Sequence, residues 1–389
     1  ARDARPAWRM RLRPTIVSAV GVRTAATPPM PSSTQSKTPP RLKADWEAVP
    51  RRMGLGLAAL GRPGYINLGH GADLGAGSQA TEAGMRDRAE AVLDAAWARG
   101  VRWFDAARSY GLAERFLGDW LRSRGVQPQD VCVSSKWGYR YTAAWRVDTD
   151  GAPHEVKDHS VAHFETQLAE TLETLGDYVD VYQIHSATFE SGVLDDADVL
   201  AALARVKRER GWKIGLSVSS PQQPDVLAAA LEIRMPPPSE GGPPNREDAD
   251  DANAAKEELL LFDACQVTYN LLEQSPAPAL QRAHDRGVAV IVKEAMANGR
   301  VLRCAPLLAA AEQLQCAPDA LALAAVLAQP FQPHVLSGAV TAQQLDSNLE
   351  AADLVDRLKA DPAFLHKLLD DCRQDPATYW ADRAALAWN

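Results

Sequence analysis

The chain has 389 residues, of which 46% are hydrophobic and 24% are charged, and its formal net charge is −8. This composition is typical of a globular protein with one large domain or two average ones. A net negative charge argues against a basic field for nucleic acid, and no apolar stretch approaches the roughly 20 residues that cross a bilayer. We therefore expect a soluble protein with no membrane span and no nucleic-acid partner.

The N-terminal segment differs from the rest of the chain in charge. Residues 1–43 contain nine arginine or lysine residues and one acid, Asp3. An Arg-rich and acid-poor composition is typical of a transit peptide for a chloroplast or mitochondrion, and the alternative is a disordered extension. We exclude residues 1–50 from the fold in either case, and without targeting we expect a cytoplasmic protein.

From residue 53 onward, short apolar runs alternate with segments of helical periodicity. Helices are predicted over 88–100, 163–176, 198–211 and 277–287, and several of them end in Arg-Gly, a helix-terminating signal. The apolar runs predict strands, which lie at 53–60, 101–107, 131–138, 179–186, 213–220, 262–270, 288–295 and 334–340. Apolar strands separated by helices are typical of a parallel sheet buried on both faces. Eight such units predict an α/β fold, a single-domain (β/α)8 TIM barrel over residues 51–389, rather than an open doubly wound sheet.

Long loops and one insertion interrupt this alternation. The connections 61–81 and 139–159 follow predicted strands, and the strand-to-helix loops of such a barrel form its active site. The segment 234–258 lies between a helix and a strand instead, and its Pro, Gly and acidic residues predict a disordered insertion on the opposite face. The glycine-rich stretch 69–77 predicts a flexible loop rather than a dinucleotide fingerprint. The stretch 154–159 predicts a solvated lid, because its histidines lack the spacing of a metal site.

Polar side chains stand where three neighbouring strands are predicted to end. Asp105 ends the second strand and is followed by Tyr110, Lys136 ends the third, and His185 ends the fourth. Each has a structural interpretation by itself: a helix cap, a core-edge aromatic, a solvated charge and a core histidine. Because the carboxyl ends of parallel strands meet at one face of the barrel, their joint position there predicts one catalytic patch.

Such a quartet suits proton transfer by a phenol, whose pKa is ordinarily near 10. We expect the ammonium of Lys136 to lower the pKa of Tyr110 and the carboxylate of Asp105 to keep the lysine charged. His185 would hydrogen-bond the substrate oxygen. The group would polarise a carbonyl and protonate the alkoxide that forms as hydride arrives.

With these residues the sequence resembles the aldo-keto reductases over about residues 53–350. The resemblance rests on FDAARSYG, SSKWG, DVYQIHS, GLSVSS, QVTYN, ANGR and SGAVTAQQLDSN, in that order. It implies a barrel that reduces an aldehyde or ketone with a nicotinamide cofactor, usually NADPH, and that uses Tyr110 as the proton donor. It also implies cofactor contacts, from Ser219, Ser220 and Gln266 to the carboxamide and from Gly338, Gln344 and Asn348 to the adenosine.

The chain departs from the family pattern at three places. Lys293 and Glu294 stand at the end of the seventh strand, where many members have an aromatic ring that stacks on nicotinamide. Ser220 stands where asparagine is common. The segment 338–348 has no basic residue to meet a 2′-phosphate, unless Arg300 or Arg303 reaches it, so we expect NADPH and keep NADH as the alternative.

The aromatic residues after the third strand are candidates for contact with a small-molecule carbonyl substrate. We predict substrate binding by Trp137 and Tyr139, whereas Trp145 could equally pin its loop to the barrel. The C-terminal segment 378–388 has an amphipathic pattern, which predicts a segment packed across the barrel mouth or the outer helices.

Two other classes of function stay open. The barrel could be a nicotinamide-binding regulatory or scaffold subunit with little turnover, because fold alone does not decide catalysis. It could also be an aldolase-like enzyme that forms a Schiff base on Lys136 or Lys293. No metal site is predicted, and the sequence leaves both a monomer and a homo-oligomer open.

Overall fold

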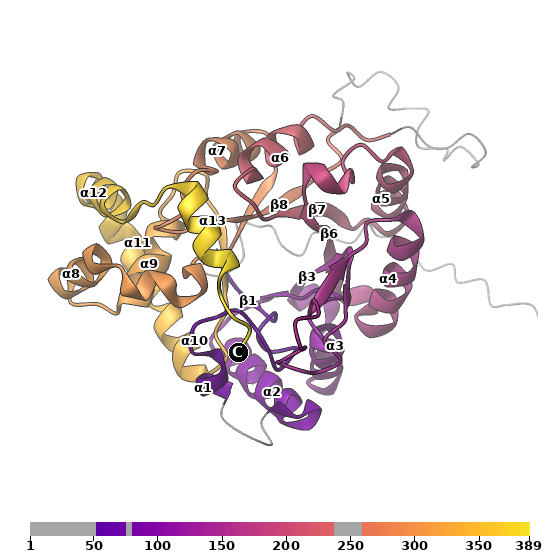
Figure 1. Ribbon diagram of the computed structural model, residues 1–389, viewed down its shortest axis with the longest axis horizontal. Coiled ribbons are helices and arrows are strands. Elements are labelled where there is room, and N and C mark those ends of the chain that lie inside the picture. Colours follow the sequence, from indigo (N-terminus) through magenta and orange to yellow (C-terminus); the bar gives the residue numbers. More distant parts are fainter. Residues whose placement is uncertain (1–51, 75–79, 237–258) are drawn as a thin grey trace, which may run out of the picture. The chain divides into compact units, whose positions relative to one another are not determined.

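The computed structural model describes residues 52–74, 80–236 and 259–389. The predicted N-terminal extension, 1–50, and most of the predicted insertion, 234–258, lie outside the described residues. The described chain forms a closed barrel of parallel strands with helices around it, so the predicted (β/α)8 TIM barrel is confirmed (Figure 1). Around the barrel the strands follow the order β1 (Met53–Gly56), β10 (His334–Ser337), β9 (Ala289–Lys293), β8 (Ala264–Thr268), β7 (Lys213–Val218), β6 (Val179–Ala187), β3 (Cys132–Trp137) and β2 (Trp103–Asp105).

The eight barrel strands coincide with the eight apolar runs of the sequence, because a strand covered by helices outside and side chains inside is apolar on both faces. The helices of the outer layer are α2 (Glu82–Ala98), α3 (Ala113–Ser123), α4 (Val161–Thr174), α5 (Ala197–Arg210), α6 (Gln223–Ala230), α7 (Ala277–Asp285), α8 (Ala305–Leu314), α9 (Pro318–Leu327), α10 (Ala342–Leu349), α11 (Ala351–Ala360) and α12 (Pro362–Cys372). Side-chain caps fix several of their starts. Thr81, for example, accepts a hydrogen bond from the backbone N–H of Gly84 at the start of α2.

The inside of the barrel has an apolar layer near the amino ends of the strands. This layer consists of Trp103, Cys132, Val181, Ala264, Ile291 and Leu336, which form a cluster separate from the strand-to-helix core. The indole of Trp103 fits because Gly54 on the neighbouring strand has no side chain; a Cβ there would lie 2.3 Å from the ring. Side chains alternate along a strand, so residues two and four positions later point into the same interior. Asp105, Lys136 and His185 occupy such positions.

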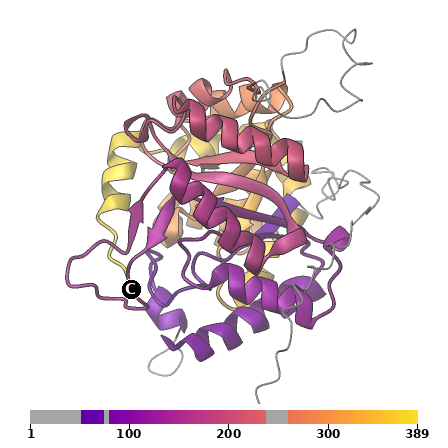
Figure 2. The ribbon, with the colours of Figure 1, turned by 90° about the vertical axis from the view of Figure 1, so that its right-hand side faces the viewer.

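Two additions lie at one end of the barrel. The strands β4 (Tyr139–Tyr141) and β5 (Glu155–Lys157) form an antiparallel hairpin in the long loop after β3. The helix α13 (Pro376–Ala384) and the C-terminal residues lie on the same side of the barrel as this hairpin (Figure 2). The C-terminal segment therefore packs across the barrel mouth, which is the first of the two positions predicted for it.

Two loop predictions are wrong in part. Residues 70–74 of the glycine-rich stretch form a short helix, α1 (His70–Leu74), while 75–79 lie outside the described residues. The predicted lid at 154–159 contains strand β5, because Tyr139 and Lys157 pair across the hairpin. Trp145 donates its indole N–H to the Ala80 carbonyl at 2.8 Å, so it holds its loop against the barrel.

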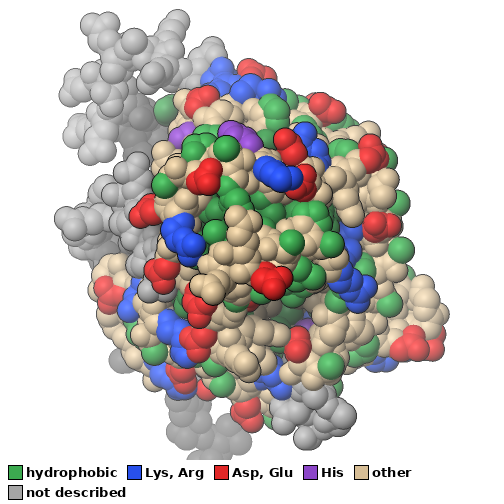
Figure 3. Space-filling view, turned by 90° about the vertical axis from the view of Figure 1, so that its left-hand side faces the viewer, with side chains coloured by type: hydrophobic (Ala, Val, Ile, Leu, Met, Phe, Trp, Pro, Cys, Tyr) green, Lys and Arg blue, Asp and Glu red, His purple; other side chains and the backbone are tan. Residues whose placement is uncertain are grey.

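The described helices and one face of the surface bear on the expectations about membrane spans and charge. None of the helices in the described ranges is long and apolar enough to cross a membrane. On the face shown in Figure 3, acidic and basic side chains are interspersed around hydrophobic ones, without a field of one sign.

Candidate active site

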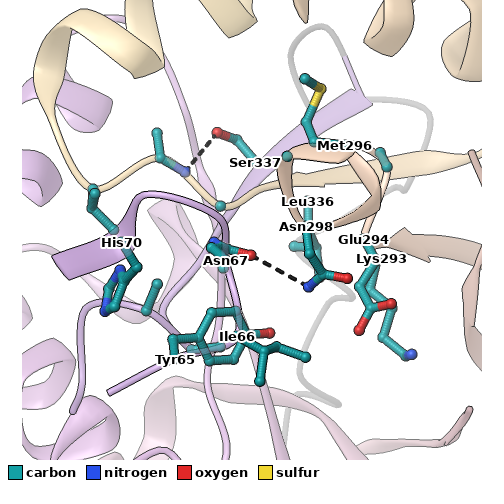
Figure 4. A pocket seen from close by; sticks show the side chains of 18 of the residues that line it. Tyr65, Ile66, Asn67, His70, Lys293, Glu294, Met296, Asn298, Leu336 and Ser337 are labelled. Carbon is teal, nitrogen blue, oxygen red and sulfur yellow. Dashed lines mark hydrogen bonds between the residues drawn. The ribbon is translucent and has the colours of Figure 1, made fainter. Parts of the chain in front are cut away.

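A cavity of about 450 Å³ opens at the carboxyl ends of the strands. Its inner end is lined by Asp105, Tyr110 and His185, and its far end by Gln344 and Asn348. Tyr65 and Ile66 lie on one side of the cavity, and Lys293, at the end of β9, and Glu294, which follows it, lie on the other (Figure 4). The cavity thus connects the predicted catalytic residues with the predicted adenosine segment.

Asp105 is the centre of a buried polar layer inside the barrel. Its carboxylate accepts hydrogen bonds from the ammonium of Lys136 at 2.5 Å and from the hydroxyl of Ser134 at 2.6 Å. The side-chain amide of Gln266 donates to it at 3.1 Å. Lys136 is fully buried and also donates to the Ala106 carbonyl at 2.8 Å. The predicted pairing of acid and lysine is therefore present, and it fixes both side chains.

Tyr110 and His185 lie directly beside this pair. The ammonium of Lys136 is 4.8 Å from the centre of the Tyr110 ring, and the Tyr110 and His185 rings meet edge to face at 5.4 Å. The hydroxyl of Ser109 is 3.3 Å from Nδ1 of His185. Three neighbouring barrel strands, β2, β3 and β6, thus bring the four residues together as the sequence predicts.

The ionisation of Tyr110 differs from the prediction. Burial and the facing carboxylate of Asp105 raise the pKa of Tyr110 well above 10, so the predicted lowering by Lys136 is wrong. Burial also lowers the pKa of Lys136, although the ion pair with Asp105 opposes this shift. Burial, with the nearby cations, holds the pKa of His185 well below 6.5. At neutral pH the phenol is therefore protonated and the imidazole is neutral.

Sequence reasoning missed Arg62, a buried arginine in the first strand-to-helix loop. It donates to the Glu155 carboxylate at 2.8 Å and to the Ser109 carbonyl at 2.9 Å, and it lies over the rings of Tyr110 and Trp388. The only signal was a charged residue between Gly61 and Pro63 in a predicted substrate loop. Its partner Glu155 lies in the stretch 154–159, which the sequence predicts to be a solvated lid.

The end of β9 adds a second group of charges. Lys293 donates to the hydroxyls of Ser219 at 2.6 Å and Thr268 at 2.7 Å. Glu294 accepts from the guanidinium of Arg383 on α13 at 2.8 Å. Burial would raise the pKa of Glu294, but Arg383 and Lys293 lower it to about 2. This ion pair fastens the C-terminal helix to the barrel mouth.

The predicted cofactor residues divide into two groups. Ser219, Gln266, Gly338, Gln344 and Asn348 all line the cavity. Ser220 does not line it; its hydroxyl accepts from the backbone N–H of Gln222 instead. Gln344 donates to Asp73 at 2.8 Å, and Asn348 donates to Ser337 at 2.9 Å.

The predicted substrate residues are placed differently from each other. Trp137 is fully buried against Phe164, with ring centres 4.9 Å apart, so its predicted substrate contact is wrong. The reason is strand alternation: Lys136 points inward, and its neighbour therefore points to the helix layer. Tyr139 packs its ring on His185 at 5.0 Å without lining the cavity itself.

The structure also bears on the Schiff-base alternative at Lys136 and on metal binding. A Schiff base on Lys136 requires a free amine, and its ammonium is held by Asp105 and the Ala106 carbonyl. Within the described residues, no group of three or more His, Cys, Asp or Glu side chains is arranged to hold a metal ion.

A closed parallel barrel with an ionisable cluster at the carboxyl ends of its strands is the architecture of a TIM-barrel enzyme. Residues 67–361 match the Aldo/keto reductase family. The chain therefore belongs to the aldo-keto reductase family, and it is an oxidoreductase of that class.

Individual relatives are distant. The "Uncharacterized oxidoreductase YqkF" of Bacillus subtilis is 24% identical over 308 residues, which cover 72% of this chain and 86% of that protein. The D-threo-aldose 1-dehydrogenase of a Pseudomonas species is 33% identical over 167 residues, 38% of this chain and 50% of the enzyme. Among solved structures, the holo form of aldo-keto reductase AKR11C1 from Bacillus halodurans superposes with a TM-score of 0.53 at 19% identity, covering 82% of this chain and 91% of that one. This last likeness supports the fold alone.

Proposed function

We propose that this protein reduces an aldehyde or ketone to an alcohol, with a nicotinamide dinucleotide as the hydride donor and Tyr110 as the proton donor. The observation that carries the proposal is the meeting of Tyr110, His185 and the Asp105–Lys136 pair at the inner end of one long cavity. One observation fits a polar ligand such as a dinucleotide: Oδ1 of Asn298, a residue that lines the cavity, is a buried acceptor without a hydrogen-bond partner in the described chain. When bound, the dinucleotide supplies the hydride.

The side chains of the site have distinct tasks in this reaction. In the tautomer of His185 whose Nδ1 accepts from the Ser109 hydroxyl, the other ring nitrogen carries the proton and can donate it in a hydrogen bond to the carbonyl oxygen. Tyr110 keeps its proton at neutral pH and releases it to the alkoxide, which is a much stronger base than a phenolate. Lys136 then stabilises the phenolate, and Asp105 holds Lys136 in place.

We propose NADPH as the dinucleotide, with NADH as the alternative. The guanidinium of Arg300 donates to the Tyr379 carbonyl and lies over that ring, so it is directed at the C-terminal helix. Arg88 is a better candidate for a 2′-phosphate, because its guanidinium reaches the Val340 carbonyl at 3.4 Å. An Arg88→Met variant is therefore expected to lose affinity for NADPH and to keep its affinity for NADH.

The test of the function is a binding titration followed by a turnover assay. NADPH and NADH are titrated by fluorescence, and loss of dihydronicotinamide absorbance is then followed with aldehydes, ketones and D-threo-aldoses. The sugars are included because of the Pseudomonas relative. Tight binding without oxidation of the cofactor across the panel would favour the nicotinamide-binding subunit instead.

The role of Tyr110 is tested by substitution with phenylalanine. Tyr110→Phe is expected to lower turnover by at least about 100-fold, since it removes the donated proton, and to change the dissociation constant of the cofactor little. Tyr178→Phe is the matched control, because that phenol donates to the Val126 carbonyl away from the cavity. Turnover within twofold of wild type in Tyr110→Phe would contradict the proposed role.

A further inference from the structure

Lys293 is a cation inside the cavity that the proposed reaction does not use. It is the last residue of β9, and it points into the barrel because it lies two positions after Ile291, a member of the inner apolar layer. Its ammonium donates to two hydroxyls, those of Ser219 and Thr268. The side chain is thus held at a fixed place beside the reacting end of the cavity.

Lys293 forms no ion pair in the described chain: the carboxylate of Glu294 next to it acts on its charge at longer range and is itself paired with Arg383. Of the cations that line the cavity in the described chain, Arg62 is paired with Glu155 and Arg383 with Glu294. Lys293 has no carboxylate within ion-pair distance among the described residues, and its hydroxyl partners are neutral. A positive charge therefore remains at the inner end of the cavity.

This charge reaches the place where hydride transfer would occur. Tyr110, His185, Gln266 and Lys293 line the same cavity, and Lys293 is one of the cations that lower the pKa of His185. A nicotinamide ring that delivers hydride to a carbonyl held by Tyr110 and His185 must lie next to them. The ring then lies in the field of Lys293.

The two redox forms of the ring differ in charge, since dihydronicotinamide is neutral and oxidised nicotinamide carries a positive charge. We propose that Lys293 biases the cofactor site toward the reduced dinucleotide, so that the site binds the hydride donor more tightly than the oxidised product. This inference rests on the proposed function. For like charges about 5 Å apart at an effective dielectric constant of about 20, the repulsion corresponds to a preference of up to about 250-fold, and water in the cavity reduces it toward tenfold.

The bias is expected to depend on pH. Burial lowers the pKa of Lys293 to about 8, so raising the pH above 8 removes its charge and strengthens binding of the oxidised form. Among the surrounding charged and titratable groups, the Glu294–Arg383 pair keeps its charges, the imidazole is already neutral, and the phenols have raised pKa values. Burial lowers the pKa of Lys136 as well, so the substitution of Lys293 separates the effects of the two lysines. The surrounding groups are Glu294–Arg383, Asp105–Lys136, His185, Tyr110, Tyr65 and Tyr379.

The experiment measures dissociation constants of NADPH, NADP⁺, NADH and NAD⁺ by calorimetry and fluorescence at pH 6.5 and pH 9.5. Lys293→Met keeps the length of the side chain and removes its charge. In the variant the ratio of the oxidised to the reduced dissociation constant is expected to fall at least about tenfold at pH 6.5 and to become independent of pH. Lys157→Met is the control, because this lysine is near the mouth but does not line the cavity.

Each outcome decides between the two proposals. If both redox forms bind and the ratio is the same in wild type and in Lys293→Met, the bias is refuted and carbonyl reduction stands. If neither form binds to the wild-type protein, the proposed function fails and the bias with it. If the variant does not fold, the wild-type ratio still decides, because a ratio that is equal at both pH values would refute the role of Lys293.

Discussion

Replacing Asp105 by asparagine tests how the buried charges of the barrel interior are balanced. The carboxylate accepts hydrogen bonds from Lys136, Ser134 and Gln266, and Lys136 has no exposed surface. In Asp105→Asn the amide keeps one acceptor oxygen, but the ammonium of Lys136 loses its counter-charge in the interior. Removing one partner of a buried ion pair costs about 3–5 kcal/mol, and we expect a loss of this size in the free energy of unfolding.

Urea unfolding followed by tryptophan fluorescence and circular dichroism measures this loss. Ser134→Ala is the control that leaves both charges in place: it removes the hydroxyl that donates to the same carboxylate and accepts from the Trp103 indole N–H, and it is expected to cost about 2 kcal/mol. The double variant Asp105→Asn with Lys136→Met removes both charges, so it is expected to be more stable than Asp105→Asn alone.

The pH dependence of Asp105→Asn gives a second check. Without the carboxylate, burial holds the pKa of Lys136 further below its value in the unfolded chain, so the unfolded state binds more protons than the folded state. The stability of the variant therefore rises with pH, and its deficit is larger at pH 6 than at pH 9. A single variant within about 1 kcal/mol of wild type, or a double variant that is the less stable of the two, would refute this account.

Two further predictions concern the mouth of the cavity. A Cβ at Gly61 would lie 2.2 Å from the backbone oxygen of Tyr110. Gly61→Ala is therefore expected to lower the free energy of unfolding, measured in urea, by about 1–3 kcal/mol and to lower turnover. Gly64→Ala is the control, because a Cβ there would have its nearest neighbour at 3.4 Å, and it is expected to change neither quantity. The pKa of Glu294 is about 2, below its unfolded value, so its ion pair with Arg383 stabilises the protein above about pH 4.5 and is lost as the pH falls toward 2. The stability difference between wild type and Glu294→Gln, measured by urea unfolding from pH 3 to pH 7, should therefore shrink on acidification; a constant difference would contradict it.

The catalytic end of the barrel could be predicted from the sequence because it depends on local rules. A buried strand that ends in a polar residue places that residue at the carboxyl end, and barrel closure brings neighbouring strand ends together. Asp105, Lys136 and His185 follow from these two rules alone. The same alternation, applied one residue further, would have directed Trp137 away from the cavity and toward the helix layer.

The residues at the mouth could not be predicted in this way, because their positions depend on contacts between distant parts of the chain. Arg62 is directed by Glu155, which is 93 positions away, and Glu294 by Arg383, which is 89 positions away. None of these four residues lies on a barrel strand, so strand alternation gives no information about either pair. The shift in the pKa of Tyr110 could not be predicted for a related reason, because its direction depends on how deeply the phenol is buried.

These long-range pairs connect the substrate loops to the charge balance of the site. Each joins an arginine to a carboxylate on a different segment: Arg62 in the first loop to Glu155 in the hairpin, and Arg383 on α13 to Glu294 next to β9. Because both pairs are neutral as units, the mouth closes around Tyr110 without adding net charge to the cavity. The ammonium of Lys293, which has no ion-pair partner among the described residues, is then the cation that a ligand at the inner end meets, and its sign distinguishes a neutral ring from a cationic one.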